Sequence, residues 1–210
     1  MNYYDNYRLF VGLETSSHFF WSCSMDVITA IYNRHSIGKV KPDSLPRETV
    51  EKLLDAAVQA PNHHKVRPWR FVVLFGTGRE KLGQIMAASF KARFPDAPAE
   101  AFEKEARKPL RAPLIIVVAV DLPSEPKINE LENICAAATA CQNILLAAQG
   151  LGLAAIWRTG DTARDPEIKK FLGFAPEQPL LGFLYIGYPD FVPVEVAARP
   201  SFEDRTVWMD

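Results

Sequence analysis

Cationic and hydrogen-bonding side chains gather at two places in the chain where a regular apolar pattern ends. Arg34, His35 and Ser36 follow the first helical pattern, and Arg158 and Thr159 follow a short strand-like run. The planar guanidinium of arginine matches phosphate and carbonyl oxygens, and each charge-assisted hydrogen bond contributes about 1.5–3 kcal/mol. Such clusters suit an anionic ligand, although many proteins carry the same residue types as a solvated corner.

A third group of donors occupies the loop 62–68. His63, His64, Lys65 and Arg67 lie between Pro61 and Pro68, directly before an aromatic and β-branched run that predicts a buried strand. The two prolines restrict the backbone at both ends of the loop. A rigid loop that is rich in donors is a typical place for binding residues.

Other patterns that resemble catalytic or cofactor motifs fail on inspection. Gly76 and Gly78 precede a helical pattern, but Lys81 stands where a dinucleotide fingerprint needs a third small residue, so a simple turn is favoured. No GxSxG elbow marks a serine hydrolase. The histidines lack the spacing of a metal site; they are His18, His35, His63 and His64. No metal is therefore predicted.

The three cysteines, Cys23, Cys135 and Cys141, form no CxxC pair, which argues against a disulfide framework and favours a reducing compartment, the cytoplasm. Cys135 and Cys141 fall in an apolar helical pattern, where a thiolate is disfavoured. The formal net charge of −1 and the pI near 6.4 make nucleic acid an improbable partner. The uncharged run 133–157 contains polar and glycine interruptions, so we expect a buried helix in place of a membrane span.

The elements that must position these residues alternate between helix and strand. Helices are predicted at 25–34, 46–60, 81–94, 99–108, 134–151 and 166–172, and strands at 69–75, 114–120, 154–157 and 180–188. The class is mixed α and β, in a single domain spanning 25–210. Residues 1–24 lack periodicity and are expected to form an extension, or to precede a natural start at Met25. The alanine-rich helix 134–151 suits either a subunit interface or a plain core.

Taken in order, several blocks resemble the FMN-dependent nitroreductase family, particularly its compact NAD(P)H nitroreductases. The blocks are Asn33-Arg34-His35-Ser36, Ala60-Pro61-Asn62-His63 through Arg67-Pro68-Trp69-Arg70-Phe71, Arg111-Ala112-Pro113, Gly150-Leu151-Gly152, Ile156-Trp157-Arg158-Thr159-Gly160, and Gly182 to Pro189. They extend from Met25 to about Pro189. The Pro-Trp-Arg-Phe-Val entry to the strand is the most specific of them.

The resemblance implies an α+β fold, with a central sheet flanked by helices, assembled as a homodimer with FMN sites at the subunit interface. It implies that Arg34, His35 and Ser36 contact the phosphate and ribityl chain, while His63 and Arg67 come from the other subunit. Trp157, Arg158 and Thr159 would lie beside the flavin. Ala147 would lie near bound nicotinamide.

The chain departs from the family pattern at His35, where a second arginine is common, at Arg67, where a neutral amide is usual, and at Thr159, where serine is frequent. The extra charge of Arg67 suggests a more acidic substrate or a preference for NADPH over NADH. Arg199 and Arg205, beyond the matching blocks, are candidates to reach the phosphate or to wrap the partner subunit.

The resemblance implies an NAD(P)H-dependent oxidoreductase that reduces nitroaromatics, quinones or similar small acceptors by a ping-pong mechanism. The flavin carries the hydride, which accounts for the lack of a nucleophile or an acid–base pair. Arg158 is the candidate stabiliser of the reduced anionic flavin. Two alternatives remain: a flavin-binding or storage module without turnover, and a dehalogenase-like enzyme with a lid drawn from Phe90, Phe94 and Phe102.

Overall fold

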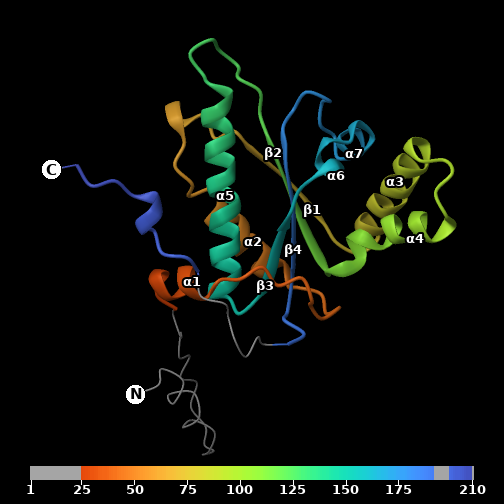
Figure 1. Ribbon diagram of the computed structural model, residues 1–210, viewed down its shortest axis with the longest axis horizontal. Helices are drawn as coiled ribbons and strands as arrows, with labels where there is room; N and C mark the ends of the chain where they lie inside the picture. The colour runs from red at the N-terminus through yellow and green to blue at the C-terminus, as the bar shows by residue number, and fades with distance from the viewer. Residues whose placement is uncertain (1–24, 192–198, 210) are drawn as a thin grey trace, which may run out of the picture.

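The centre of the protein is a four-stranded sheet in which every pair of neighbouring strands is antiparallel. A computed structural model describes residues 25–191 and 199–209 (Figure 1). The strands are β1 (Trp69–Leu74), β2 (Leu114–Val120), β3 (Ala154–Arg158) and β4 (Leu180–Gly187), in the order β1-β2-β4-β3. This sheet confirms the predicted α+β class. A dinucleotide fold of the Rossmann type needs parallel strands, which this sheet lacks. Gly76 turns the chain before the next helix at φ +50°, as predicted, whereas Gly78 lies in the first turn of that helix.

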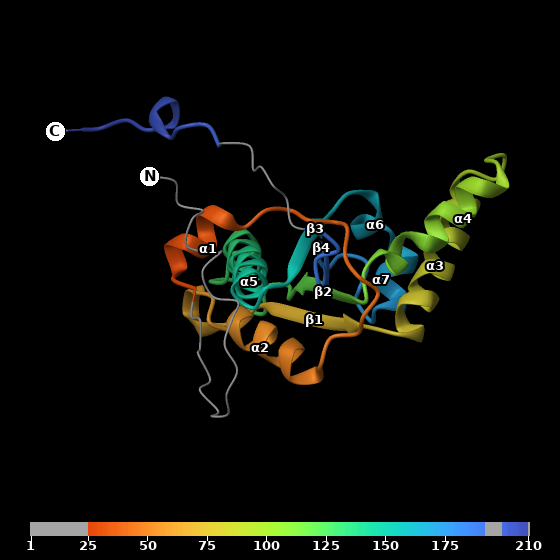
Figure 2. The same cartoon turned by 90° about the horizontal axis from the view of Figure 1, so that it is seen from below.

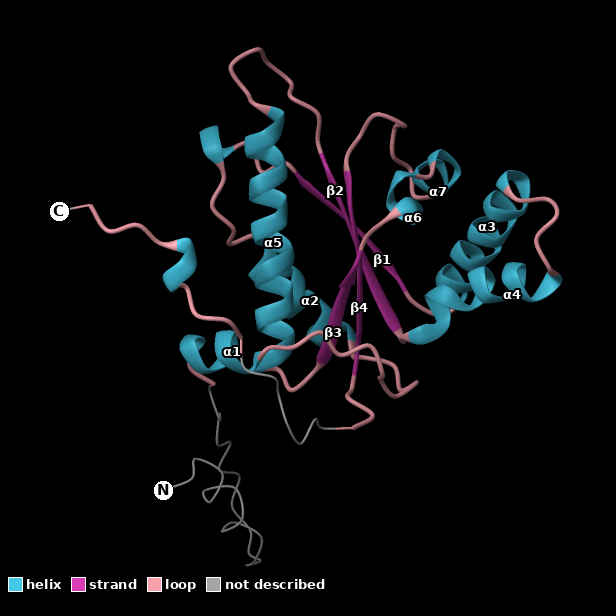
Figure 3. Cartoon of the chain, viewed as in Figure 1, coloured by secondary structure: helices cyan, strands magenta, loops and turns pink. Residues whose placement is uncertain are grey.

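Each predicted helix is found within a few residues of its expected bounds (Figure 3). The helices are α1 (Val27–Asn33), α2 (Arg47–Ala57), α3 (Thr77–Arg93), α4 (Ala99–Arg107), α5 (Glu130–Gly150), α6 (Asp161–Arg164) and α7 (Pro166–Phe171). Helices α3 and α5 begin four residues earlier than predicted. Asn129 caps α5 by accepting a hydrogen bond from the Leu131 N–H at 2.9 Å. The short α6 was not predicted.

The two faces of the sheet carry separate apolar cores, because side chains alternate along each strand. Ile116 of β2 and Leu184 of β4 pack under α5 and α2, whereas Val117 and Phe183 pack under α3 and α7. Figures 1 and 2 show the sheet enclosed between these two helical layers, with the α3–α4 hairpin projecting from one side. Arg158 and Trp157, neighbours on β3, must therefore point to opposite layers.

Helix α5 buries one face and leaves the other uncovered in the described part of the chain. Ala137, Ala140 and Ile144 are fully buried against the sheet, whereas Cys135 and Gln142 on the opposite side are exposed. The expectation that Cys135 lies in apolar surroundings is therefore wrong, because it falls on the uncovered side. Within residues 25–191 and 199–209 no helix is long and apolar enough to cross a membrane.

The connection between β3 and β4 is tied to α3 by the buried carboxylate of Asp165. It caps α7 through the Glu167 N–H at 3.0 Å, accepts from the Ser89 hydroxyl, and pairs with Arg93 at 3.3 Å. Its side chain is only 2% exposed. This network fixes α6 and α7, which follow the end of β3, against the body of the protein.

The phenylalanines considered as a lid pack mainly on one another. The ring of Phe90 lies 4.9 Å from that of Phe94 and 6.1 Å from that of Phe102, measured between centroids. They hold α3 and α4 together as a hairpin. The predicted extension at residues 1–24 lies outside the described residues.

Candidate functional site

The first predicted cluster lies where α1 ends and the chain turns along β3. Asp26 caps the start of α1, and Arg34 ends it in an extended conformation. The chain then runs beside β3, with Ser36 bridging Ala155 in parallel and the Ile37 N–H donating to the Ala155 carbonyl at 3.0 Å. The backbone pairing therefore holds Arg34, His35 and Ser36 at the outer edge of the sheet.

Three basic side chains meet at this corner, and one of them comes from the far end of the sequence. The Arg199 guanidinium donates to the Arg34 carbonyl oxygen at 3.0 Å. Burial, and then the charge of Arg199, lowers the pKa of Arg34 from its ordinary value. No ion pair among the described residues involves Arg34 or Arg199. Among the residues that the structure describes, these two cations have no carboxylate partner, and such an unbalanced positive charge attracts anions.

His35 is the neutral member of the corner. Burial first, and then the charges of Arg199 and Arg34, lowers the pKa of its imidazole below the ordinary 6.5, so the ring is uncharged at neutral pH. Its Nε2 atom is buried and has no hydrogen-bond partner among the described residues. A buried polar atom without a partner is costly unless a ligand or water satisfies it.

The second predicted cluster, at the end of β3, adjoins the first. The nearest guanidinium nitrogen of Arg158 lies 3.3 Å from the position that a Cβ on Gly38 would occupy, so Arg158 borders the chain that follows Ser36. Its Nε atom is also buried without a partner in the described structure. Thr159 is exposed directly after it, and Gly160 turns the chain at φ +98°.

Trp157 and Ala147 belong to the opposite layer. The Trp157 indole N–H donates to the Leu181 carbonyl at 2.9 Å, and the ring packs against the core under α5. A Cβ on Gly182 would lie 2.3 Å from the Arg158 carbonyl oxygen and 2.8 Å from that indole nitrogen, so only glycine fits at this position. Ala147, in the last turns of α5, is half-buried in the same core.

The third predicted cluster lies elsewhere. His63 and Arg67 belong to the loop around a 3-10 turn (His63–Lys65), beside the N-terminal half of α5, where His63, Cys135 and Thr139 line one shallow cavity. His64, Lys65 and Arg67 have φ of +52°, +57° and +50°. Three residues in the left-handed region store strain that is typical of functional loops.

Within one chain, the structure does not bring the third cluster to the other two. His63 lies level with Cys135, whereas Arg34 and Ser36 lie beside β3, just beyond the C-terminal end of α5 at Gly150. At 1.5 Å per residue, the intervening helix measures about 22 Å. Figure 1 shows α1 and the 3-10 turn at opposite ends of α5.

The structure distinguishes between Arg199 and Arg205, which were both candidates to reach the phosphate. Arg199 joins the corner, whereas Arg205 pairs with its neighbour Asp204 at 3.0 Å in a fully separate turn. The sequence held no signal for this choice, because Arg199 bonds to a backbone oxygen 165 positions away. Tyr185 was also missed; its ring lies 5.6 Å from the Arg158 guanidinium.

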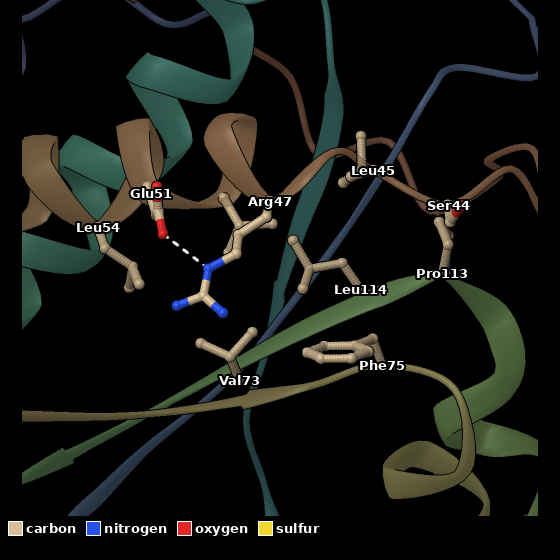
Figure 4. Close-up of a pocket in the computed structure, with 10 residues that line it drawn as sticks. Ser44, Leu45, Arg47, Glu51, Leu54, Val73, Phe75, Pro113 and Leu114 are labelled. Atoms are coloured by element: carbon tan, nitrogen blue, oxygen red, sulfur yellow. Dashed lines mark hydrogen bonds and ion pairs between the residues drawn. The ribbon is translucent and has the colours of Figure 1, made fainter.

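A mainly apolar cavity lies away from these clusters, between α2 and strands β1 and β2 (Figure 4). Its volume is about 320 Å³, and Leu54, Val73 and Leu114 line it. The one guanidinium at its rim, that of Arg47, is tied to Glu51 at 2.8 Å. In the described ranges no three His, Cys, Asp or Glu residues come close enough to hold a metal ion. Burial raises the pKa of the Cys141 thiol to about 12, so it is not a nucleophile.

The protein combines an α+β fold, built on an antiparallel sheet, with a cationic corner at the end of its first helix. Comparisons with known proteins identify the family that has this fold. The family model "Nitroreductase family" matches residues 31–188, and the chain belongs to this family. The Escherichia coli protein named "Putative NAD(P)H nitroreductase YdjA" is 30% identical over 165 residues, covering 79% of this chain and 89% of its own length.

Two solved structures illustrate the likeness of the fold. A nitroreductase-like family protein from Bacillus cereus superposes with a TM-score of 0.75 at 24% identity, covering 94% of this chain and 99% of the other. A Desulfovibrio desulfuricans protein described as a "putative nitroreductase in complex with fmn" gives a TM-score of 0.67 at 25% identity, covering 88% and 96%.

Proposed function

We propose that this protein is an FMN-dependent oxidoreductase that uses NAD(P)H to reduce nitroaromatics, quinones or similar small acceptors. The observation that carries the proposal is the corner of Arg34, His35 and Arg199, where two cations meet with no carboxylate partner in the described part of the chain. Membership of the nitroreductase family and the FMN complex of a relative support FMN as the anion.

The residues of the corner fit the cofactor. A phosphate accepts hydrogen bonds and carries negative charge, which matches the guanidinium groups of Arg34 and Arg199 and the hydroxyl of Ser36. The unpartnered Nε atoms of His35 and Arg158 mark where further polar groups of a ligand would be satisfied. We therefore assign the phosphate to the corner and the ring system to the adjoining end of β3, beside Arg158 and Thr159.

When bound, FMN supplies the hydride chemistry, taking two electrons from NAD(P)H and passing them to the acceptor in a ping-pong sequence. The protein's own residues bind the cofactor and set the electrostatic environment of its ring. Arg158 would supply a positive charge that stabilises negative charge developing on the ring, and its half-buried position would strengthen that effect. The backbone of Trp157 borders the ring while its indole remains in the core. Ala147 is assigned to the nicotinamide side.

Homodimer formation would complete the site. His63 and Arg67 lie about 22 Å along α5 from the corner of their own chain. Two chains that pair antiparallel through α5 would bring this loop of one chain to the corner of the other. The uncovered side of α5 is weakly polar, with Cys135, Thr139 and Gln142, and suits close packing with a second copy. The charge of Arg67 in the shared site favours NADPH over NADH, and equal kcat/KM values for the two would contradict that preference.

The first experiment is spectroscopic. We expect purified protein to bind FMN and turn yellow, anaerobic NADPH to bleach it, and a nitroaromatic or quinone to restore the colour. Protein that neither carries nor takes up FMN would refute the proposal. Yellow protein that NAD(P)H does not reduce would indicate the flavin-binding module without turnover. Size-exclusion chromatography with light scattering tests the dimer independently.

A further inference from the structure

A small cavity of about 130 Å³ opens in the layer of α3 and α6, and its polar lining is almost entirely basic and hydroxylic. It lies on the Tyr185 side of the sheet, opposite the layer of α5. The polar side chains that line it are Lys108, Arg111, Arg158, Thr159, Thr162 and Tyr185. Only Arg158 and Thr159 belong to the cofactor site proposed above.

The cavity carries an unbalanced positive charge. Lys108 is paired with Glu105 at 2.5 Å, whereas neither Arg111 nor Arg158 takes part in an ion pair among the residues that the structure describes. Three cations facing one carboxylate leave a net charge of two. In a partly enclosed site such a charge attracts oxyanions strongly, because solvent screens it less than it would on an open surface.

Tyr185 adds a hydroxyl donor to the two free guanidiniums. Burial raises the pKa of Tyr185 from its ordinary value, and the neighbouring Arg158 and Arg111 oppose the shift. The phenol therefore stays protonated at neutral pH and can donate to an anion. The Arg158 guanidinium lies 5.6 Å from the centre of the tyrosine ring, and both residues line the same cavity.

The size of the cavity limits what it can hold. A water molecule occupies about 30 Å³ in the liquid, so the space equals roughly four waters, and pockets for whole ligands measure about 300–1,000 Å³. A carboxylate or phosphate group fits, whereas the three-ring system of a flavin does not. The rest of such a ligand must lie outside the cavity, past the exposed Thr159.

We propose that this cavity is an anion subsite that binds a carboxylate or phosphate group of a small-molecule substrate and makes the enzyme prefer acidic acceptors. The proposal rests on the function proposed above, because Arg158 would adjoin both the subsite and the flavin. An acceptor anchored by Arg111 and Tyr185 would extend along the end of β3 toward the ring.

The test compares R111Q with R107Q, which removes the same charge from the nearby exposed face of α4, where Arg107 pairs with Glu103. Arg111 is exposed and forms no ion pair in the described structure, so R111Q is expected to fold. With 4-nitrobenzoate and 4-nitrobenzamide as a matched acceptor pair, we expect wild type and R107Q to favour the acid in kcat/KM. R111Q should reduce that preference about tenfold or more, the equivalent of one charge-assisted bond, and leave the amide unchanged.

A second pair of substrates separates the two possible sources of the anion. If R111Q changes the NADPH to NADH ratio and spares the acceptor ratio, the subsite serves the 2′-phosphate of the reductant and the acceptor preference is refuted. Unchanged ratios for both pairs overturn the subsite altogether. Loss of FMN from R111Q would show that the cavity belongs to the cofactor site, which also overturns it.

Binding without turnover keeps this inference distinct from the proposed function. Benzoate is not reducible here, so calorimetric titration of the purified protein with benzoate measures the subsite directly. We expect binding to wild type and R107Q that weakens about tenfold in R111Q and in K108Q, whether or not the protein reduces nitro compounds. Equal benzoate affinity in all four proteins would refute the subsite and leave the flavin chemistry untouched.

Discussion

Replacement of Arg34 by Gln separates the binding role of the corner from any structural role. The substitution removes a guanidinium that the described structure pairs with no carboxylate. The hydrogen bond from Arg199 to position 34 uses the backbone carbonyl, so it survives the change. Repulsion between the two cations disappears as well. We therefore expect the free energy of unfolding of the FMN-free protein to change by less than about 0.5 kcal/mol.

FMN binding should respond strongly to the same change. Loss of one charge-assisted hydrogen bond removes about 1.5–3 kcal/mol, which corresponds to an increase of about 10- to 150-fold in Kd. The remaining affinity should also depend less on salt, because one cation fewer faces the phosphate.

Fluorescence titration of FMN into the apoprotein measures the Kd, and urea unfolding measures stability. R47Q is the matched control, since Arg47 lies on the exposed face of α2 and pairs with Glu51. A change in FMN Kd below threefold for R34Q, or a loss of more than 1 kcal/mol in the apoprotein, would show that Arg34 is not a phosphate ligand held in a preformed corner.

Four further predictions concern pH and packing. The lowered pKa of His35 means that the unfolded chain binds a proton that the folded apoprotein does not. The free energy of unfolding should therefore fall as pH drops below about 6.5 and level off above it. The same pH series on His35→Gln should lose that slope. Bound phosphate would raise this pKa, so FMN affinity should increase over the same fall in pH, and a flat titration would count against contact between them. Asp165→Ala should lower stability by about 2 kcal/mol in urea unfolding, because the cap of α7 and the pairing with Arg93 are lost, and a change under 0.5 kcal/mol would contradict that network. Gly182→Ala should destabilise the protein by about 1–3 kcal/mol, since the added methyl group meets the Arg158 carbonyl oxygen and then the Trp157 indole, and since φ at this position is +135°; an unchanged Tm would refute the close contact.

The sequence predicted the elements well where the signal is local. The apolar run 114–120 predicted both ends of β2 correctly, because an uninterrupted stretch rich in β-branched residues after Pro113 favours a strand over a helix. The start of α5 was missed by four residues, because Glu130 and Glu132 are charged and carry no apolar periodicity. Their place in the first turn is explained by the Asn129 cap and the favourable helix dipole.

The corner at Arg34 to Ser36 was found for the same local reason: it directly follows a helix, and its residue types are those that bind anions. The sequence by itself thus predicted the α+β class, the basic residues of the corner and a donor-rich loop at His63, whereas the strain of that loop is seen only in its backbone angles. The tertiary structure decided which charges remain free, because pairing depends on distances between residues far apart in the chain. Arg199 reaches the corner, whereas Arg158 turns to the Tyr185 layer and Trp157 to the core, since neighbouring strand residues face opposite sides of the sheet.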